Sequence, residues 1–316
     1  MCAISWRAWQ VEPPEFFNSL LDPDRRDEKR QGFRYHAAQI RRKIMFAGWI
    51  AEKLFLPLWA LPLLFVLLIS VRYLLFAGGA LALITLFQKP LAPRRIQPLP
   101  FTAKQLWREA GWSFLSISIF GLIFIGLFVA NQRLGWFQIY RDIDQKGWLW
   151  FGLSIPIAVL IHDFYFYWTH RFMHLPGVFE RIHKVHHLST NPSPLSAFAF
   201  HPIEAVIEAG AVLTIALLIP IHPIALALTM LYSILTNVMG HMGYELLPRG
   251  FATNPWLNWI NTATSHNQHH RTFTSNYGLY TLVWDRLFGT LHARYADLYA
   301  KVTAPKAADG VLGTTK

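Results

Sequence analysis

Long apolar blocks recur along this 316-residue sequence and restrict the folds that it can adopt. A helix that crosses a bilayer needs about 20 apolar residues, or roughly 17 at the short end. The blocks cover residues 54–71, 73–88, 112–131, 148–161, 203–220 and 221–240, and only Arg72 separates the first two. We therefore expect an all-α integral membrane protein with about four to six membrane or re-entrant helices beneath a cytoplasmic helical cap. The pair within 203–240 is expected to form a shallow re-entrant hairpin.

The same pattern divides the chain into four regions. We expect a cytoplasmic segment at 1–45, membrane helices and a linker at 46–147, a histidine-rich domain at 148–292 and a tail at 293–316. Four prolines within 89–104 are typical of an exposed linker. The first segment is too charged for a signal peptide, so the first span is expected to act as the insertion signal.

The net charge of +11 follows the positive-inside rule rather than the pattern of a nucleic-acid-binding protein. Segment 1–43 carries nine basic residues, and 89–108 carries five basic residues and no acidic one. Segment 132–147 has three basic residues against two acidic ones. This distribution predicts that 1–43 and 89–108 are cytoplasmic and that 132–147 lies opposite. The chain then runs out at 54–71, in at 73–88, out at 112–131 and in at 148–168.

Three histidine clusters provide eight of the 14 histidines. Residues three or four apart share one face of a helix, so each cluster is expected to present its imidazoles to one side. A zinc ion takes about three or four protein ligands, so eight nitrogens indicate two metal ions in one site. The predicted ligands are His170, His174, His183, His186, His187, His266, His269 and His270.

Further polar residues near these clusters are weaker candidates. His241 ends the last apolar block and is predicted as a ninth ligand, and His162 and His201 are less certain ones. Asp163, Tyr167 and Glu245 are candidates to accept hydrogen bonds from ligand imidazoles. No catalytic residue is predicted beyond the metal ligands, and His36, His222 and His292 are interpreted as structural.

Histidine ligands do not identify the metal, because imidazole suits zinc, copper, iron and nickel alike. The single cysteine, Cys2, argues against a cysteine-ligated zinc or an iron–sulfur site. Histidine-bound metals beside a membrane, without an HExxH protease motif, favour oxygen chemistry on a lipid over hydrolysis of a polar substrate.

The ordered motifs HDFYFYWTHRFMH, HKVHH, FHPIE, GHMGYE, HNQHH and NYGLYTLVWDRLFGT resemble the fatty acid hydroxylase/sterol desaturase superfamily of membrane-bound non-haem di-iron oxygenases. The resemblance covers roughly residues 150–292. It implies two iron ions on the eight box histidines, an additional ligand at His241 and O2 as co-substrate. Zinc can replace iron in recombinant protein, because it binds nitrogen sites more tightly than ferrous iron.

The leading hypothesis is an oxidoreductase of the monooxygenase type that hydroxylates or desaturates a sterol, fatty acyl or related membrane lipid. Electrons are expected to come from a separate reductase or carrier. The metal site is expected to lie on the cytoplasmic face of a bacterial inner membrane or of the endoplasmic reticulum. Phe164, Phe166, Phe198 and Phe200 are candidates to line the lipid path. Oxidative cleavage of an ether or aldehyde lipid at the same site is an alternative reaction. A metal-transporting or haem-binding membrane protein is the alternative outside enzymes.

Overall fold

The computed structural model describes residues 60–305, so the predictions for 1–45 and His36 lie outside the described residues. The described part is helical and contains isolated β-bridges but no strand. Four helical runs are long and apolar enough to cross a membrane: Leu61–Leu86, Ala103–Asn131, Gly147–Met173 and Pro223–Gly240. The expectation of an α-helical membrane protein is confirmed.

The first run differs from the prediction of two spans at 54–71 and 73–88. Helices α3 (Leu61–Tyr73), η2 (Leu74–Gly78) and α4 (Gly79–Leu86) continue one another, and Arg72 does not interrupt them. No proline breaks residues 63–89, and a π-helical turn at η2 accommodates the two glycines that follow Phe76 and Ala77. The described chain therefore crosses once here instead of going out and back.

The second and third spans are the long helices α6 (Ala103–Leu134) and α7 (Gly147–Met173). The Thr102 side chain caps α6 by accepting a hydrogen bond from the Gln105 amide, and Gly135, at φ 66°, ends the helix in the left-handed conformation. The connecting loop includes the short helix η4 (Ile143–Gln145). Helix α7 then returns the chain to the end of the molecule from which α6 started.

Helices α9 (Pro202–Leu218) and α10 (Pro223–Gly240) form the expected hairpin, each beginning with proline at its first position. Its tip binds the α6–α7 loop: the Gln138 amide donates to the Ala216 carbonyl at 3.0 Å, and the Ile221 amide donates to the Gln138 carbonyl at 2.9 Å. The hairpin therefore extends along the bundle as far as that loop, and of its two helices only Pro223–Gly240 is long and apolar enough to be a candidate span. The shallow dip stays a prediction.

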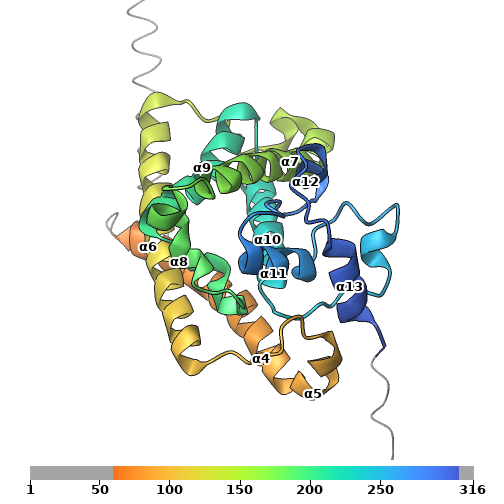
Figure 1. The fold of residues 1–316 in the computed structure, drawn as a ribbon. Helices are drawn as coiled ribbons and strands as arrows, with labels where there is room; N and C mark the ends of the chain where they lie inside the picture. Colours follow the sequence, from red (N-terminus) through yellow and green to blue (C-terminus); the bar gives the residue numbers. More distant parts are fainter. Residues whose placement is uncertain (1–59, 306–316) are drawn as a thin grey trace, which may run out of the picture. The chain divides into compact units, whose positions relative to one another are not determined.

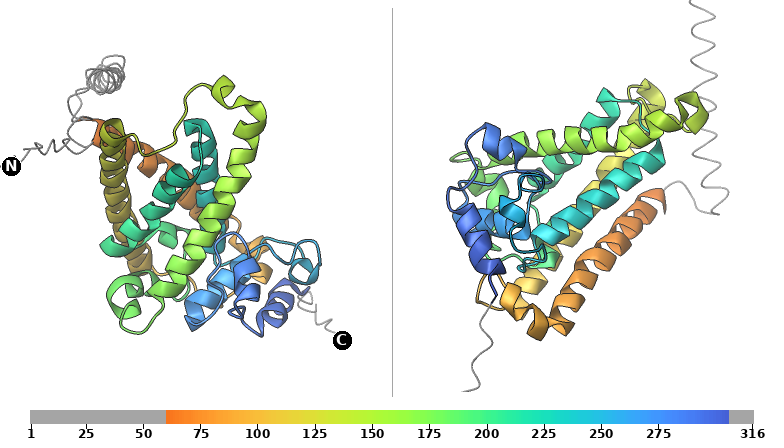
Figure 2. Two further views of the ribbon diagram at one scale, coloured as in Figure 1. Left: turned by 90° about the horizontal axis from the view of Figure 1, so that it is seen from above. Right: turned by 90° about the vertical axis from the view of Figure 1, so that its right-hand side faces the viewer.

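At the opposite ends of these helices the chain builds a set of short helices and loops (Figures 1 and 2). In chain order these are α5 (Gln88–Leu91), η3 (Ala92–Arg94), η5 (Phe179–His183), α8 (Lys184–His187), η6 (Pro194–Phe198), η7 (Phe251–Thr253), α11 (Ala263–Thr272), α12 (Val283–Leu287) and α13 (Tyr295–Thr303). We call them, with their loops, the cap. The chain is helical through Thr303, so the predicted tail begins later than residue 293.

Segment 89–104 is largely exposed, as predicted, but its middle part also pairs with other segments of the cap. The Glu245 amide donates to the Arg94 carbonyl at 2.9 Å, and the Ile96 amide donates to the Gly243 carbonyl at 3.0 Å. The Gln97 amide group also donates to Asn267 Oδ1 at 2.7 Å. The prolines prevent a regular helix here and leave other backbone groups of the segment free to pair with the rest of the cap.

A hydrophobic cluster joins the early helices to the histidine-rich region. Ile69, Tyr73, Ile117, Phe198 and Val238 are among its buried members, and they come from α3, α6, η6 and α10. The Tyr73 hydroxyl donates to the Leu195 carbonyl at 2.7 Å. These contacts fix η6, which precedes α9, against the membrane helices.

Candidate metal centre

Nine histidines converge where the membrane helices meet the cap. The first group, called site A, consists of His170, His174, His183, His187 and His269. The second, called site B, consists of His186, His241, His266 and His270. Within each group the nitrogens that can bind a metal lie within 4.8 Å of one another. The structure thus brings together the eight box histidines and His241.

The histidine motifs divide between the two sites. His183 and His187 face site A, whereas His186, between them in sequence, faces site B. The third cluster divides in the opposite sense, with His269 in site A and His266 and His270 in site B. The expectation that each cluster forms one clip therefore needs correction, since the second and third clusters each serve both sites.

Local backbone structure explains how the second cluster reaches both sites. His183 ends the π-helical turn η5, and His186 and His187 follow in the one-turn helix α8. Successive residues of a helix point about 100° apart, so His186 and His187 face different directions, as His269 and His270 do in the regular helix α11.

Hydrogen bonds fix the protons of several imidazoles on Nδ1. The Nδ1 atoms of His170, His183 and His269 lie 2.8 Å from the Tyr277 carbonyl, 2.7 Å from Glu204 Oε1 and 2.6 Å from the Ser275 carbonyl. In site B, His241 Nδ1 lies 2.7 Å from the Asn237 carbonyl. A neutral imidazole has one N–H, so a ring that donates through Nδ1 presents a lone pair at Nε2.

The converging lone pairs fit bound cations. His170 Nε2 and His183 Nε2 are 3.1 Å apart, although both carry lone pairs. In site B, His266 Nε2 lies 3.1 Å from His241 Nε2 and 3.2 Å from His270 Nε2. Two nitrogens bound at about 2.1 Å on perpendicular bonds lie about 3.0 Å apart, which matches these distances. The buried His174 Nε2 has no hydrogen-bond partner among the described residues, as expected of an atom oriented for a metal.

Burial keeps these ligands in the form that binds metals. Loss of solvation, followed by the effect of neighbouring imidazoles, holds the pKa of His186 and His187 well below the usual value. Both rings are therefore neutral at physiological pH and retain a lone pair.

Comparisons with known proteins also support a histidine-bound metal centre of the kind that the sequence motifs indicated. A family model described as fatty acid hydroxylase matches residues 155–290, which contain all nine histidines. A Delta(7)-sterol 5(6)-desaturase of Gibberella zeae is 29% identical over 236 residues, which is 72% of this chain and 71% of the relative. A probable Delta(7)-sterol 5(6)-desaturase of Neurospora crassa is 29% identical over 252 residues, or 79% of this chain and 67% of the relative.

Lathosterol oxidase of Mus musculus is 30% identical over 193 residues, which is 60% of this chain and 62% of the relative. No solved structure gives a match. The family model and these relatives support the fatty acid hydroxylase/sterol desaturase superfamily, which the sequence motifs of this chain resemble. The chain is an oxidoreductase, as the sequence motifs predicted.

Glu204 is a supporting residue that the sequence reasoning did not assign. It is fully buried near the start of α9, and its carboxylate accepts the Nδ1 proton of His183. A carboxylate in this position orients the ring and makes the imidazole more basic. The available signal was an acidic residue inside the apolar block 203–220, where burial requires a partner.

The three predicted acceptors of imidazole protons contact other groups instead. Asp163 accepts from the Tyr280 amide at 2.8 Å and from Thr281 Oγ1 at 2.6 Å. Tyr167 hydrogen-bonds Thr290 at 3.0 Å, and Glu245 accepts from the Thr264 amide at 2.9 Å. The structure places none of the three against a ligand imidazole; the Tyr277 and Ser275 carbonyls and Glu204 accept the ring protons of His170, His269 and His183 instead.

These residues nevertheless position the elements that carry ligands. Glu245 caps the N-terminus of α11, and a carboxylate there also interacts favourably with the helix dipole. Asp285, also unassigned from the sequence, accepts the amides of Tyr277 and Gly278, each at 2.8 Å. It thereby fixes the Tyr277 carbonyl that binds His170.

The remaining histidines of the described chain lie outside both sites. His162 Nδ1 pairs with the Tyr280 hydroxyl at 2.9 Å, deep in the membrane bundle. His201 and His222 accept backbone amides at the starts of α9 and α10 and therefore act as helix caps. His292 pairs with Gln268 at 2.9 Å. The weaker ligand candidates His162 and His201 are thus placed away from the metal-binding groups.

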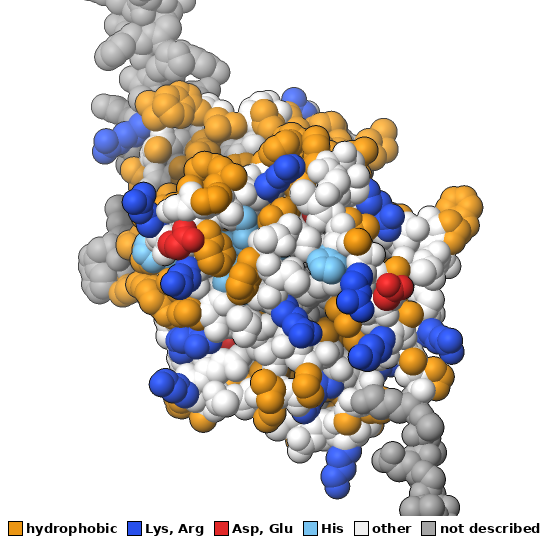
Figure 3. Space-filling view, viewed as in Figure 1, with side chains coloured by type: hydrophobic (Ala, Val, Ile, Leu, Met, Phe, Trp, Pro, Cys, Tyr) orange, Lys and Arg blue, Asp and Glu red, His pale blue; other side chains and the backbone are white. Residues whose placement is uncertain are grey.

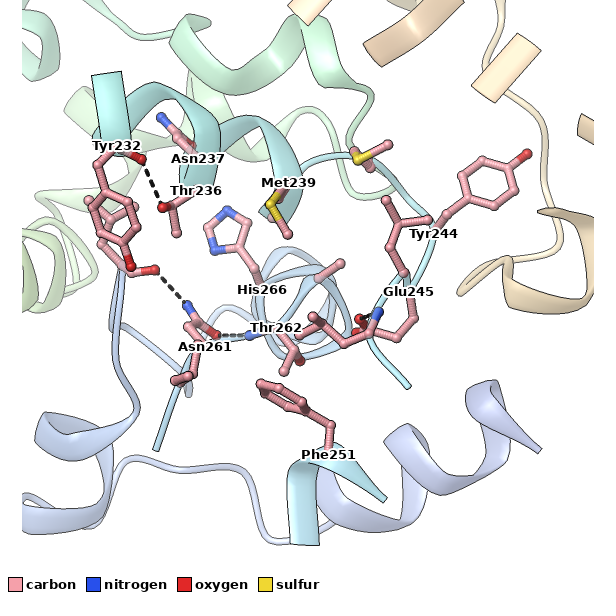
Figure 4. A pocket seen from close by; sticks show the side chains of 17 residues that line it. Tyr232, Thr236, Asn237, Met239, Tyr244, Glu245, Phe251, Asn261, Thr262 and His266 are labelled. Carbon is pink, nitrogen blue, oxygen red and sulfur yellow. Dashed lines mark hydrogen bonds between the residues drawn. The ribbon is translucent and has the colours of Figure 1, made fainter. Parts of the chain in front are cut away.

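A cavity of about 330 Å³ opens beside site B, and we call it the α10 cavity. His266 projects into it from α11, while Tyr232, Thr236 and Met239 contribute from α10 (Figure 4). Its walls are mostly apolar, with Met242, Leu246, Leu247 and Phe251 among the lining residues. Tyr232 and Met239 are exposed on the membrane helix, so the cavity is accessible from an apolar surface.

Proposed function

We propose that the chain binds two iron ions, one in site A and one in site B, and uses O2 to hydroxylate or desaturate a membrane lipid. The observation that carries this proposal is the pair of histidine groups whose lone pairs converge at the ends of the membrane helices. Each group provides enough neutral nitrogen donors for one ion. The relatives named above act on sterols, which makes a sterol or a related lipid the first substrate to test.

A bound iron pair supplies the reductive activation of O2 for attack on an unactivated carbon–hydrogen bond. The residues of this chain contribute position and environment. Glu204 and the Tyr277 carbonyl hold the rings of His183 and His170 in fixed orientations. Burial of the histidines excludes bulk water, while the α10 cavity gives an apolar substrate access to His266. An oxidisable carbon and the metals can therefore meet in a dry site.

Both reactions need two electrons and two protons in addition to the lipid and O2. Hydroxylation places one oxygen atom in the product and one in water, whereas desaturation places both in water. We propose that a separate carrier with an acidic surface delivers the electrons. Exposed basic residues surround the cap, namely Arg181, Lys184, Arg249, Arg271, Arg286, Arg294 and Lys301. Figure 3 shows Lys and Arg spread over this face with few acidic side chains between them, which favours an acidic partner.

Metal analysis combined with lipid profiling tests the proposal. Purified protein is expected to hold two ions per chain, and cells that express it should accumulate an oxidised lipid. His186→Ala and His269→Ala, one in each site, should each abolish the product. His222→Asn is the control, because asparagine retains the helix cap far from the metals. One ion or fewer in folded wild-type protein would contradict the two-metal proposal.

A further inference from the structure

The interior of the membrane bundle contains a second polar group that the metal sites do not explain. Arg72 lies within the apolar helix α3, and its buried Nε has no acceptor among the described residues. Glu208 faces the same cavity from α9, and no described residue forms an ion pair with either side chain. Ionisable residues inside a membrane helix are costly and usually serve a function.

Helical register places other polar residues at a similar depth. His162 precedes His170 by eight residues on α7, and Ser233 precedes His241 by eight on α10, a rise of about 12 Å in each case. Glu208 lies one helical turn beyond Glu204, which holds His183. All three line the cavity with Arg72. We call Arg72, His162, Glu208 and Ser233 the polar floor.

Aromatic side chains separate the polar floor from the metal sites. The Phe166 ring centroid lies 4.9 Å from that of His170, and the Phe200 centroid lies 5.2 Å from that of His186. Both phenylalanines also line the cavity above the floor. A molecule bound here therefore meets polar groups at one end and apolar walls toward the metals.

This small cavity, of about 70 Å³, adjoins two larger ones. It shares Asn237 and Leu279 with the α10 cavity, and Arg72 and Met230 with a cavity of about 240 Å³ near Ile139 and Ile221. The polar floor thus lies between two spaces that can hold apolar parts of a ligand. Its own volume suits a small polar group rather than a large head group.

The chemistry of the floor selects among lipid polar groups. The Arg72 guanidinium can only donate hydrogen bonds, whereas the side-chain oxygens of Glu208 can accept them. A hydroxyl group accepts from one and donates to the other, whereas a carboxylate or phosphodiester head group has no hydrogen to donate to Glu208 and is large for this cavity. We propose that the polar floor binds the hydroxyl of a neutral lipid alcohol, whose apolar body extends toward the metal sites. This inference rests on the proposed function, because it assigns the polar end of the substrate.

Equilibrium binding without reductant tests it, using cholesterol and cholestane, a matching hydrocarbon that lacks the hydroxyl. Wild-type protein in nanodiscs is expected to bind the sterol more tightly. Arg72→Met and Glu208→Met should each weaken sterol binding roughly 10- to 100-fold, the effect of losing a buried hydrogen bond to a charged group. Hydrocarbon binding and metal content should stay unchanged. Arg133→Met, at the exposed end of α6, is the matched control.

Equal affinities of wild-type protein for the sterol and the hydrocarbon would overturn the inference, because the polar floor would then bind water and not the sterol hydroxyl. An equal loss of affinity for the sterol and the hydrocarbon in the variants would overturn the inference as well. If Arg72→Met does not fold, Glu208→Met supplies the comparison, and Arg72→Lys, which keeps a donor, should retain the preference for the sterol. Because no turnover is needed, a failed metal or product assay with intact sterol discrimination would contradict the proposed reaction and leave the hydroxyl site supported.

Discussion

The proton positions of individual imidazoles determine whether the nine histidines can act as ligands. His183 illustrates this, because its Nδ1 proton is committed to Glu204 and its Nε2 lone pair faces His170 and His187. Since one carboxylate fixes the tautomer, a change at Glu204 should affect metal binding without touching a ligand.

We predict that Glu204→Leu lowers activity and metal affinity about 10- to 100-fold, the range for loss of a group that orients a ligand. Glu204→Gln should retain more of both, since its side-chain oxygen still accepts the Nδ1 proton. Activity and metal content of the purified variants provide the measurement, with the exposed Glu180→Gln as control. Full metal occupancy in Glu204→Leu would show that His183 needs no such support.

Residue spacing was sufficient to single out the box histidines that the structure brings together, but not their supporting groups. Nitrogens three or four residues apart point to a shared site in any short helical segment. The partner of His183 lies 21 residues away on another helix, and three other partners are backbone carbonyls, which no side-chain pattern reveals. Asp163 and Glu245 were recognised as important, but their contacts with backbone amides depend on tertiary structure.

At the scale of elements, the segment that follows α11 is tied to α7 and orients His170, a ligand of site A. Asp163 on α7 accepts three hydrogen bonds from residues 280 and 281 and one from Trp284. The same loop carries Tyr277, whose carbonyl binds His170. Asp163 therefore connects a membrane helix to the segment that orients a ligand of site A.

Asp163→Ala is predicted to lower the melting temperature and to reduce activity, because it leaves buried N–H and O–H donors without acceptors at about 1–3 kcal/mol each. Asp163→Asn, which keeps one acceptor oxygen, should have a smaller effect. Thermal unfolding in detergent and turnover are the readouts. Loss of metal at an unchanged melting temperature would instead indicate a direct role in metal binding.

The end of α10 must lie close to α11 for site B to form. A Cβ built on Gly240 lies 3.2 Å from His266 Cδ2, which is tighter than ordinary contact. Gly240→Val is therefore predicted to displace His266 and to lower metal occupancy toward one ion per chain. Gly126→Val on α6 is the control, because nothing lies within 4 Å of its added Cβ. Equal metal content in the two variants would contradict this requirement for close packing.

The predicted helix boundaries were wrong where hydropathy does not show whether one helix continues into the next apolar block. Residues 54–71 and 73–88 were separated on the charge of Arg72, but a π-turn and intact backbone hydrogen bonding carry one helix past it. Prolines in 89–104 indicated a break in helix, which is correct after Leu91, but not the pairing of that segment with residues 243–247. Contacts between segments distant in sequence leave no periodic signal in either one.

For the whole molecule, the continuous helix Leu61–Leu86 changes the predicted topology. The two crossings assumed at 54–88 placed segments 1–43 and 89–108 on the same side. One crossing in the described chain instead separates residue 60 from residue 88, while segment 89–102 stays bound to the cap. We propose that the cap and its metal sites face the cytoplasm, because exposed Lys and Arg residues concentrate there.

Cysteine labelling in intact cells tests this sidedness after replacement of Cys2. Thr190→Cys and Thr274→Cys lie on exposed parts of the cap, whereas Asp144→Cys lies in the exposed α6–α7 loop at the opposite end. An impermeant thiol reagent should label position 144 in intact cells and positions 190 and 274 only after permeabilisation. Reaction of 190 and 274 in intact cells, with 144 protected, would reverse the orientation. The metal sites would then lack contact with cytoplasmic reductant, and the proposed carrier would have to act from the other side of the membrane.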